Sequence, residues 1–559
     1  MVRRLFSIMA REIRGLHEAA YLLAFFALLS QILALVRDKL FAYSFGASHT
    51  LDIYYAAFRV PDLIFVSIGS LVSASILLPY FINKFGESDK EGKSFSDTIF
   101  TVFFTAIIIV SVIVYFITPW ITPKIIPGFA NDPYLPQLIL SIRIMLLSPL
   151  FLGLSNLYSS LTQMRHRFLV YAISPVVYNL GIIIGILFIY PLVGIYGLAI
   201  GVVIGAFMHM AIQIPFLSYE KLVPRFTMIV QWIKIKSVVL STLPRTITLA
   251  ANQIASFVLV AIASLMVPGS ISVFNFAFNL QAVPLTIIGV SYSSAVFPTL
   301  SRLYFEKNGK EFLEKMIISA QHIIFWSMPI MILFIVLRAQ IVRTILGSGQ
   351  FDWADTRLTA AMLALFIIST IGQSLVILFI RAFYAEGETQ KPLLINIISA
   401  VIIIILGYVL TKLFYSWPAF SFFFEDLLKV GGQIGTSVLM LGLAYSIGTI
   451  INLVLHWYVF TRKYRDFSRP VLATFYHSFA SSIIMGYAAF LSLRVFDQIF
   501  PLNKVWGIFM QGLCAGLFGI VIGIIILILL KNREFKEVWR TIHGKIWKVV
   551  IPPAEVERM

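Results

Sequence analysis

The chain has 559 residues, of which 59% are hydrophobic and 12% charged, and its mean hydropathy is +0.91. These values exclude a soluble globular protein, because such proteins are roughly half apolar and about a quarter charged. The apolar residues form runs of about 20 or more, the length at which a helix crosses roughly 30 Å of hydrocarbon. The short alternating strands of a membrane β-barrel are missing from the sequence. We therefore expect an all-α polytopic membrane protein.

The net charge of +17 does not point to nucleic acid, because the basic residues stand between the apolar runs, where they act as topology signals. Cys514 is the only cysteine, which excludes an intrachain disulfide and a cysteine-based metal cluster. The histidines lack metal-ligand spacing, and no phosphate loop, dinucleotide-binding glycine motif or nucleophile elbow is present. We expect no cofactor, no metal site and no catalytic residues.

In chain order, residues 1–18 are basic and amphipathic, which predicts a cytoplasmic interfacial helix. A basic tail at 532–559 ends the chain. Fourteen transmembrane helices are predicted between these segments, with centres near Ile32, Phe65, Ile108, Ser148, Tyr178, Gly205, Ala250, Pro284, Ile323, Ser369, Ile402, Tyr445, Ser482 and Phe518.

The loops between the predicted spans alternate in charge. One set is almost free of basic residues and includes SFGASHT, YPLVG and VPGS. The other set is basic and includes Lys84, Lys90, Lys93, Arg165, Arg167, Lys221, Arg225, Arg302, Lys307, Lys310 and Lys391. By the positive-inside rule the basic set and both termini are cytoplasmic, which agrees with an even number of spans.

An internal repeat appears at an offset of about 220 residues, since YAAFRVP at 55–61 resembles FAFNLQAVP at 276–284. Six spans separate the two copies, so both copies cross the membrane in the same direction. We therefore predict two pseudo-symmetric six-helix lobes, 19–220 and 221–465, with the substrate cleft between them. Two extra helices, at 466–531, lie outside the repeat.

Two early apolar stretches hold several charged residues, namely Arg37, Asp38, Asp52, Arg59 and Asp62. A charged side chain at the centre of a span costs roughly 2.5–3.5 kcal/mol on insertion scales. A chain that keeps several of them is expected to have a water-filled cavity or an anionic substrate for them to face. Arg245, which follows Pro244 in the seventh span, is a further candidate because that span mirrors the first.

RDKLFAYSFGAS at 37–48, followed by Asp52 and AAFRVPDL at 56–63, resembles the MurJ (MviN) family of lipid II flippases. That family belongs to the multidrug/oligosaccharidyl-lipid/polysaccharide exporter superfamily. Further matches follow in order at IIPGFA (125–130), ISPVVYN (173–179) and RAFYAEGETQKP (381–392), and the resemblance covers about residues 20–465.

The resemblance implies a flippase that moves lipid II, a polyprenyl-pyrophosphate-linked peptidoglycan precursor, by alternating access through a central cationic cavity. It implies no enzyme activity. It places the protein in the cell inner (cytoplasmic) membrane as a monomer. The implied partners are membrane lipids, the lipid-linked anionic substrate and other cell-wall synthesis proteins.

Six residues form the candidate substrate-binding set: Arg37, Asp38, Asp52, Arg59, Arg245 and Asn279. Arg37 is expected to bind a pyrophosphate oxygen, because a guanidinium gives bidentate, charge-assisted hydrogen bonds; the alternative is a structural salt bridge between helices. Asp38 points about 100° away on the helix and is expected to hold a neighbouring arginine or helix. Asp52 lies near the predicted external edge, where a helix cap is the alternative role. Arg59 lies deeper, three positions before Asp62, with which it can pair locally.

The chain departs from the family pattern at Gln31, Phe65 and Asn279, where family members carry arginines. Arg59 and Arg245 are candidates to compensate from neighbouring turns. These departures leave open a flippase for another lipid-linked glycan or a small-molecule exporter of the same superfamily. A polytopic polyprenyl-lipid transferase is disfavoured, since the short loops offer no cluster of catalytic acids or histidines.

The last predicted span carries small residues at helical spacing: Gly512, Ala515, Gly516, Gly519 and Gly523. Family members use their two extra helices as a groove proposed to hold the polyprenyl tail. A small-residue face fits close approach of a lipid tail, but it also fits simple packing against another helix.

Overall fold

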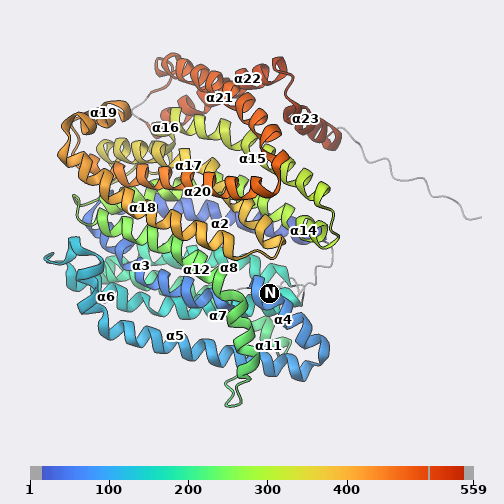
Figure 1. Ribbon diagram of the computed structural model, residues 1–559. Coiled ribbons are helices and arrows are strands. Elements are labelled where there is room, and N and C mark those ends of the chain that lie inside the picture. Colours follow the sequence, from blue (N-terminus) through green and yellow to red (C-terminus); the bar gives the residue numbers. More distant parts are fainter. Residues whose placement is uncertain (1–15, 73, 166, 502–503, 547–559) are drawn as a thin grey trace, which may run out of the picture. The chain divides into compact units, whose positions relative to one another are not determined.

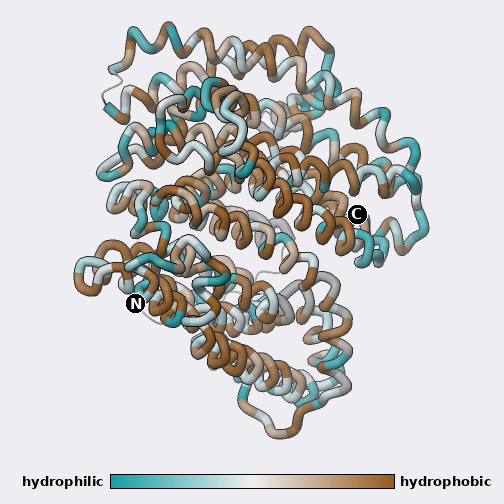
Figure 2. The backbone as a smooth tube through the Cα atoms, turned by 60° about the vertical axis from the view of Figure 1, so that its left-hand side comes forward, coloured by the Kyte–Doolittle hydropathy of each residue, from teal (hydrophilic) through white to brown (hydrophobic). Residues whose placement is uncertain are grey.

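The computed structural model describes residues 16–72, 74–165, 167–501 and 504–546 as helices joined by short turns (Figure 1). No strand occurs within these ranges. Hydrophobic residues dominate the long helices, and hydrophilic residues gather at helix ends and turns (Figure 2). The all-helical class is therefore confirmed. The interfacial helix predicted for residues 1–18 falls almost entirely outside the described residues.

Twelve helical segments of the described chain are long and apolar enough to cross a membrane. They begin at Asp89 and correspond in order to the third to fourteenth predicted spans. The first two predicted spans form helices α2 (Leu16–Phe45) and α3 (His49–Ile68), which are outside this set and carry most of the candidate charges. The protein is a multi-pass membrane protein, but the predicted count of fourteen spans is not confirmed.

The chain forms two compact units. Unit 1 comprises Met1–Val283, Ile345–Phe366 and Glu388–Asn452. Besides α2 and α3 it contains α4 (Ala74–Glu87), α5 (Asp89–Ile125), α6 (Leu135–Met145), α7 (Leu147–Met164), α8 (Phe168–Ile184), α9 (Tyr190–Val193), α10 (Tyr196–Ala211), α11 (Ile214–Tyr219), α12 (Trp232–Ala263), α13 (Ser270–Pro284), α18 (Gln390–Ser416) and α19 (Pro418–Leu428).

Unit 2 comprises Pro284–Thr344, Ile367–Gly387 and Leu453–Met559. It contains α14 (Ser291–Phe305), α15 (Gly309–Val336), α16 (Arg338–Ile345), α21 (Ser468–Asp497), α22 (Val505–Leu529) and α23 (Arg533–Ile546), while α17 (Trp353–Ala385) and α20 (Leu439–Lys463) contribute to both units. The predicted lobes, 19–220 and 221–465, rest on the internal repeat and the order of spans, whereas the two units rest on contacts between residues. The lobes remain a prediction.

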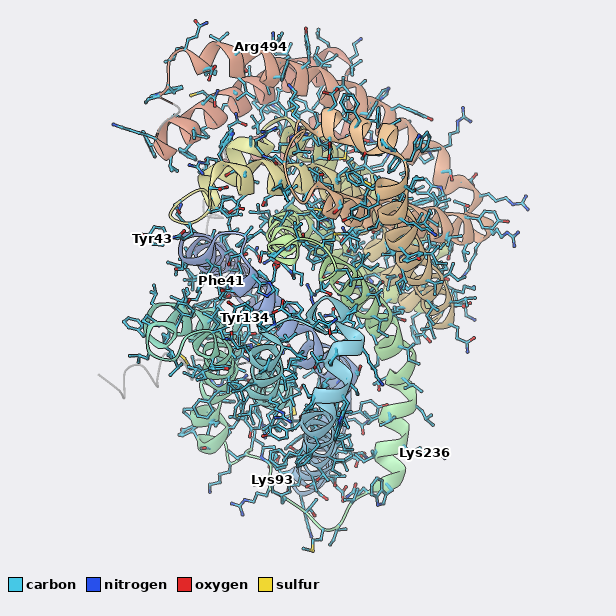
Figure 3. All side chains as sticks on the ribbon, turned by 90° about the vertical axis from the view of Figure 1, so that its left-hand side faces the viewer. Phe41, Tyr43, Lys93, Tyr134, Lys236 and Arg494 are labelled. Atoms are coloured by element: carbon cyan, nitrogen blue, oxygen red, sulfur yellow. The ribbon has the colours of Figure 1, made fainter. Side chains whose placement is uncertain are left out.

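In unit 1 the two charge-bearing helices, α2 and α3, pack against other helices of the unit. Helix α2 packs on α8, and α3 packs on α6, α7 and α12. A core of large apolar residues, with Phe81, Phe95 and Leu157 fully buried, joins α4, α5 and α7. In Figure 3, Lys93 and Lys236 lie at the opposite end of this unit from Tyr43 and Tyr134. The assignment of the basic loops and the uncharged loops to opposite sides of the membrane stays a prediction.

Unit 2 is built around α15, which packs against α14, α21 and α23, and α21 packs in turn on α22. The small-residue face of α22 is filled by this packing. A Cβ added at Gly519 would lie 2.9 Å from the Cβ of Ala489, and one at Gly516 would lie 3.2 Å from Leu337. Of the two roles considered for this face, the structure therefore favours helix packing over a groove for a lipid tail.

Candidate functional site

The centre of the candidate site is an arginine that bends back onto its own neighbour. Arg37 donates to Oδ1 of Asp38 from Nε at 3.0 Å and from Nη2 at 2.8 Å. Its Nη1 donates to Oδ1 of Asn179, on α8, at 3.1 Å. Asp38 is buried, whereas the Arg37 side chain keeps 19% exposure. Adjacent positions diverge by about 100° on a helix, but the long arginine side chain is flexible enough to return to Asp38.

The other oxygen of Asp38 joins α2 to α13. Asn279 donates from Nδ2 to Oδ2 of Asp38 at 3.1 Å. Asp38 therefore accepts hydrogen bonds from a guanidinium on its own helix and from an amide on α13, and each of its two oxygens has a donor. This arrangement suits a buried carboxylate, which is costly when its hydrogen bonds are not made.

Arg59, on α3, is held by neutral partners. Its Nη2 donates to Oδ1 of Asn275 at 2.5 Å, and its Nη1 contacts Ser256 Oγ at 3.4 Å. Its buried Nε has no hydrogen-bond partner among the described residues. Asp62 does not pair with Arg59 as the sequence spacing allowed; it accepts a hydrogen bond from Gln253 of α12. The direct hydrogen bonds of Arg59 thus go to neutral oxygens, which bind a guanidinium less strongly than a carboxylate does, while the charge of Asp62 acts on Arg59 without a hydrogen bond between them.

Asp52 caps a helix other than its own. Its Oδ2 accepts from the backbone N–H of Gly269 at 2.6 Å, and its Oδ1 accepts from the N–H of Ser272 at 2.7 Å and from the hydroxyl of Ser272 at 2.6 Å. These donors lie at the N-terminus of α13, in its first turn and in Gly269 just before it, where free N–H groups and the helix dipole favour a negative charge. The helix-cap alternative is therefore found, but across two helices instead of within α3.

One face of α13 meets all three of these groups. Ser272, Asn275 and Asn279 are spaced at i, i+3 and i+7, so they lie on the same side of the helix. They contact Asp52, Arg59 and Asp38, respectively. The sequence pattern singled out Asn279 but not Ser272 and Asn275, although three polar residues at helical spacing in an apolar segment were a usable signal.

Four turns interlock at the end of unit 1 where Asp52 lies. Ala47 N donates to Oδ2 of Asp355 at 3.1 Å, and Gln350 N donates to the carbonyl oxygen of Tyr43 at 3.0 Å. The backbones approach closely at Gly269 (φ 92°), where an added Cβ would lie 2.3 Å from the carbonyl oxygen of Ala47. These are turns of the set predicted to be external.

Two further contacts complete the closure. Gly128 N donates to Ser264 Oγ at 3.0 Å, and His49 Nε2 lies 2.9 Å from Oδ2 of Asp132. The cavity that remains beside Asp52 measures only about 80 Å³, less than the several hundred Å³ typical of a ligand pocket. This end of unit 1 is therefore closed in the structure.

The one candidate that remains, Arg245, is only partly described, and a further intramembrane arginine, Arg143, lies elsewhere. Arg245 belongs to α12, but its side chain lies outside the described part of the structure. Arg143 donates to the carbonyl oxygen of Tyr115 and stacks on that ring, so it lies apart from the cluster. Among the described residues, no group of three or more His, Cys, Asp or Glu side chains is arranged to hold a metal ion.

The charges of the cluster nearly cancel. Two arginines, Arg37 and Arg59, stand in the cluster with three aspartates, Asp38, Asp52 and Asp62, so the described side chains do not form the strongly cationic cavity that the resemblance implied. The hydrogen bonds of its two arginines go to the adjacent residue Asp38 or to neutral side chains on other helices, and a bound anion could replace these acceptors. Chemically the cluster is suited to binding an anion after rearrangement, because an incoming phosphate oxygen can replace Asp38, Asn179 or Asn275 as acceptor.

Comparison with known proteins gives a consistent picture. The family profile described as "Lipid II flippase MurJ" matches residues 41–510. The chain is 26% identical over 409 residues to the lipid II flippase MurJ of Burkholderia cenocepacia, covering 71% of this chain and 79% of that protein. It is 29% identical over 381 residues to a probable lipid II flippase MurJ of Buchnera aphidicola, covering 66% and 72%, respectively.

Solved structures show the same fold. A lipid II flippase MurJ in an inward closed conformation superposes with a TM-score of 0.70 at 21% identity, covering 93% of this chain and 99% of that chain. An inward-facing multidrug resistance MATE family transporter of the MOP superfamily superposes with a TM-score of 0.61 at 16% identity, covering 79% and 95%, respectively.

Proposed function

The chain belongs to the MurJ family of lipid II flippases, and from this we propose that it moves lipid II across the cytoplasmic membrane by alternating access. The substrate is a polyprenyl-pyrophosphate-linked peptidoglycan precursor. In this proposal the protein is a transporter and not an enzyme. It lies in the inner membrane with both termini in the cytoplasm.

The observation that carries the proposal is the row of contacts between α13 and the two charge-bearing helices. Asp38, Arg59 and Asp52 each hold a polar residue on one face of α13. A hydrogen bond to a charged group contributes about 1.5–3 kcal/mol. Such contacts keep one end closed but can be broken and remade, as a protein that alternates between two states requires.

In the proposed mechanism, Arg37 binds the pyrophosphate. Its guanidinium leaves Asp38 and gives a bidentate contact to phosphate oxygens, while Asp38 stays with Asn279. Arg59 and Arg245 supply further positive charge from neighbouring turns. They would compensate for Gln31, Phe65 and Asn279, which stand where the resemblance expects arginine.

Asp52 acts in this proposal as a latch on the external side. When it holds the first turn of α13, the external end is closed and substrate enters from the cytoplasmic leaflet. Release of Gly269 and Ser272 from Asp52 lets the first turn of α13 separate from α3. The substrate headgroup then leaves on the external side.

The deciding experiment is complementation of a MurJ-depleted bacterium with this chain. Growth and normal cell shape are expected with the native chain, and lysis is expected with Arg37→Ala at equal membrane abundance. Lysis with the native chain at normal abundance would contradict lipid II as substrate. In that case, protection against cationic drugs would identify a small-molecule exporter of the same superfamily. This alternative is favoured by Gln31, Phe65 and Asn279, which stand where the family pattern has arginine.

A further inference from the structure

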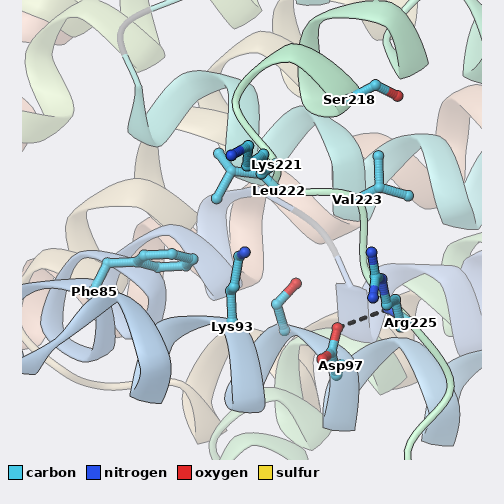
Figure 4. Close-up of a pocket in the computed structure, with 9 residues that line it drawn as sticks. Phe85, Lys93, Asp97, Ser218, Lys221, Leu222, Val223 and Arg225 are labelled. Carbon is cyan, nitrogen blue, oxygen red and sulfur yellow. Dashed lines mark hydrogen bonds between the residues drawn. The ribbon is translucent and has the colours of Figure 1, made fainter.

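A second polar pocket lies in unit 1 at the N-terminal part of α5, separate from the cluster around Arg37. Its volume is about 560 Å³, within the range of pockets that bind small ligands. It lies between α5 and the segment 218–225, which comprises the end of α11 and the chain that follows it. Figure 4 shows Lys93 rising from α5 into this space, with Lys221 and Arg225 on the opposite segment.

The pocket has an excess of positive charge. Lys93, Lys221 and Arg225 line it together with one acid, Asp97. Asp97 is already engaged, because its Oδ1 accepts the backbone N–H of Arg225 at 2.7 Å. Within the described residues none of the three basic side chains forms an ion pair. Three cations with one committed carboxylate make the pocket attractive to an anion.

A buried hydroxyl in the wall has no partner. Ser96 lines the pocket and is 2% exposed, and its Oγ makes no hydrogen bond to any described residue. Buried hydroxyls are nearly always hydrogen-bonded to protein or to a bound molecule. Ser96 therefore offers a free donor to a ligand that enters between the three basic residues.

The wall opposite α5 is fixed in position. Thr227 N donates to Thr101 Oγ1 at 3.0 Å, and the amide of Gln231 donates to Ser94 Oγ at 2.9 Å. With Asp97, these acceptors lie at i, i+3 and i+7 on one face of α5. The chain after Lys221 is thus hydrogen-bonded along α5 at three positions, so this wall of the pocket is held in place.

The segment beside the pocket exposes large apolar side chains. The exposed fractions are 61% for Phe226, 81% for Ile229 and 67% for Trp232, and Met228 is fully exposed. Several exposed apolar side chains on one short segment mark an interaction surface. Next to basic residues and an aromatic ring, it is typical of a segment that lies in the membrane interface.

We propose that this pocket binds the phosphate of an anionic phospholipid, taken from the leaflet on the predicted cytoplasmic side. Lys93, Lys221 and Arg225 surround the phosphate, and Ser96 donates to it. The apolar residues from Phe226 to Trp232 lie against the acyl chains. The site is independent of the proposed transport of lipid II, because it uses none of the residues of the Arg37 cluster.

The test is native mass spectrometry of the full chain in detergent, titrated with phosphatidylglycerol. The variant Lys93→Gln/Lys221→Gln/Arg225→Gln is expected to bind about tenfold more weakly than the native chain, since it loses three charge-assisted contacts. The matched control is Arg302→Gln/Lys307→Gln/Lys310→Gln, which neutralises three exposed basic residues outside the pocket and is expected to bind normally. Equal affinity of the native chain and the pocket variant would overturn the proposal, and so would an equal loss in the control.

Two further measurements separate a loss of binding from a loss of folding, and a lipid from a free phosphate ester. If the triple variant has a lowered melting temperature, Lys93→Gln and Ser96→Ala are measured singly. Each is expected to weaken phosphatidylglycerol binding about threefold and to leave the melting temperature unchanged. Unchanged affinity in both variants would refute the site. Soluble glycerol phosphate is the probe for the phosphate source. It is expected to compete only weakly, and competition at the same concentration as the lipid would assign the pocket to a free phosphate ester.

Discussion

Asn279 donates a hydrogen bond to the carboxylate oxygen of Asp38 that Arg37 leaves free, at 3.1 Å. A neutral amide therefore stands where the family resemblance expects a second arginine. Asp38 consequently relies on Arg37 alone for charge balance, and Arg37 is correspondingly committed to Asp38. Any anionic substrate must compete with Asp38 for the guanidinium, which sets the expected behaviour of variants at both positions.

Replacing Asn279 tests this competition directly. Asn279→Arg is expected to keep or increase lipid II transport, because a second guanidinium on Asp38 frees Arg37 for the substrate. Asn279→Asp is expected to lower transport at least about tenfold, since two carboxylates at hydrogen-bond distance repel each other. Complementation at matched membrane abundance measures both. Normal growth with Asn279→Asp would contradict the role given to the Asp38–Asn279 contact.

Substitutions at Arg37 separate charge from geometry. Arg37→Ala is expected to abolish transport, and Arg37→Lys to restore only part of it, because an ammonium cannot give the bidentate contact of a guanidinium. Arg143→Ala is the control, since Arg143 contacts Tyr115 and not the cluster. Full activity of Arg37→Ala at normal abundance would remove Arg37 from the proposed site.

The sequence predicted the helices better than the site. Every predicted span centre falls within a helix, because long apolar runs leave few other structures possible in a membrane. The charged positions were also found, since a charge in such a run is conspicuous. Their partners Asn179, Asn275 and Gln253 were missed, because an amide in an apolar helix has no visible role until the facing helix is known.

Whether Asp52 keeps the external end closed can be tested by measuring the solvent access of the neighbouring position Ile271. Ile271 is 1% exposed and lines the small cavity beside Asp52, so Ile271→Cys in a Cys514→Ala background should react slowly with an external thiol reagent. Adding Asp52→Ala removes the acceptor for Gly269 and Ser272 and is expected to speed labelling several-fold. An unchanged labelling rate would show that Asp52 does not keep this end closed.

The glycine face of α22 is expected to act on stability. Gly519→Leu inserts a side chain where a Cβ already lies 2.9 Å from Ala489, and overpacking of this kind costs about 1–3 kcal/mol. The control is Leu517→Ala on the exposed face of the same helix, where Leu517 is 53% exposed. Thermal unfolding in detergent should show a lower melting temperature for Gly519→Leu only. Normal melting combined with lost transport would instead restore the lipid-groove interpretation.

The membrane topology rests on loop charge and can be tested with two single cysteines. In the Cys514→Ala background, Ser44→Cys lies in the last turn of α2, beside the uncharged loop, and Lys307→Cys lies in the basic turn after α14; both native side chains are exposed. Because basic loops stay in the cytoplasm, a membrane-impermeant maleimide added to intact cells should label Ser44→Cys and spare Lys307→Cys. After the membrane is permeabilised, both should react, which controls for accessibility. Labelling of both positions in intact cells would contradict the proposed topology, and with it the assignment of Asp52 to an external latch and of the Lys93 pocket to the cytoplasmic leaflet.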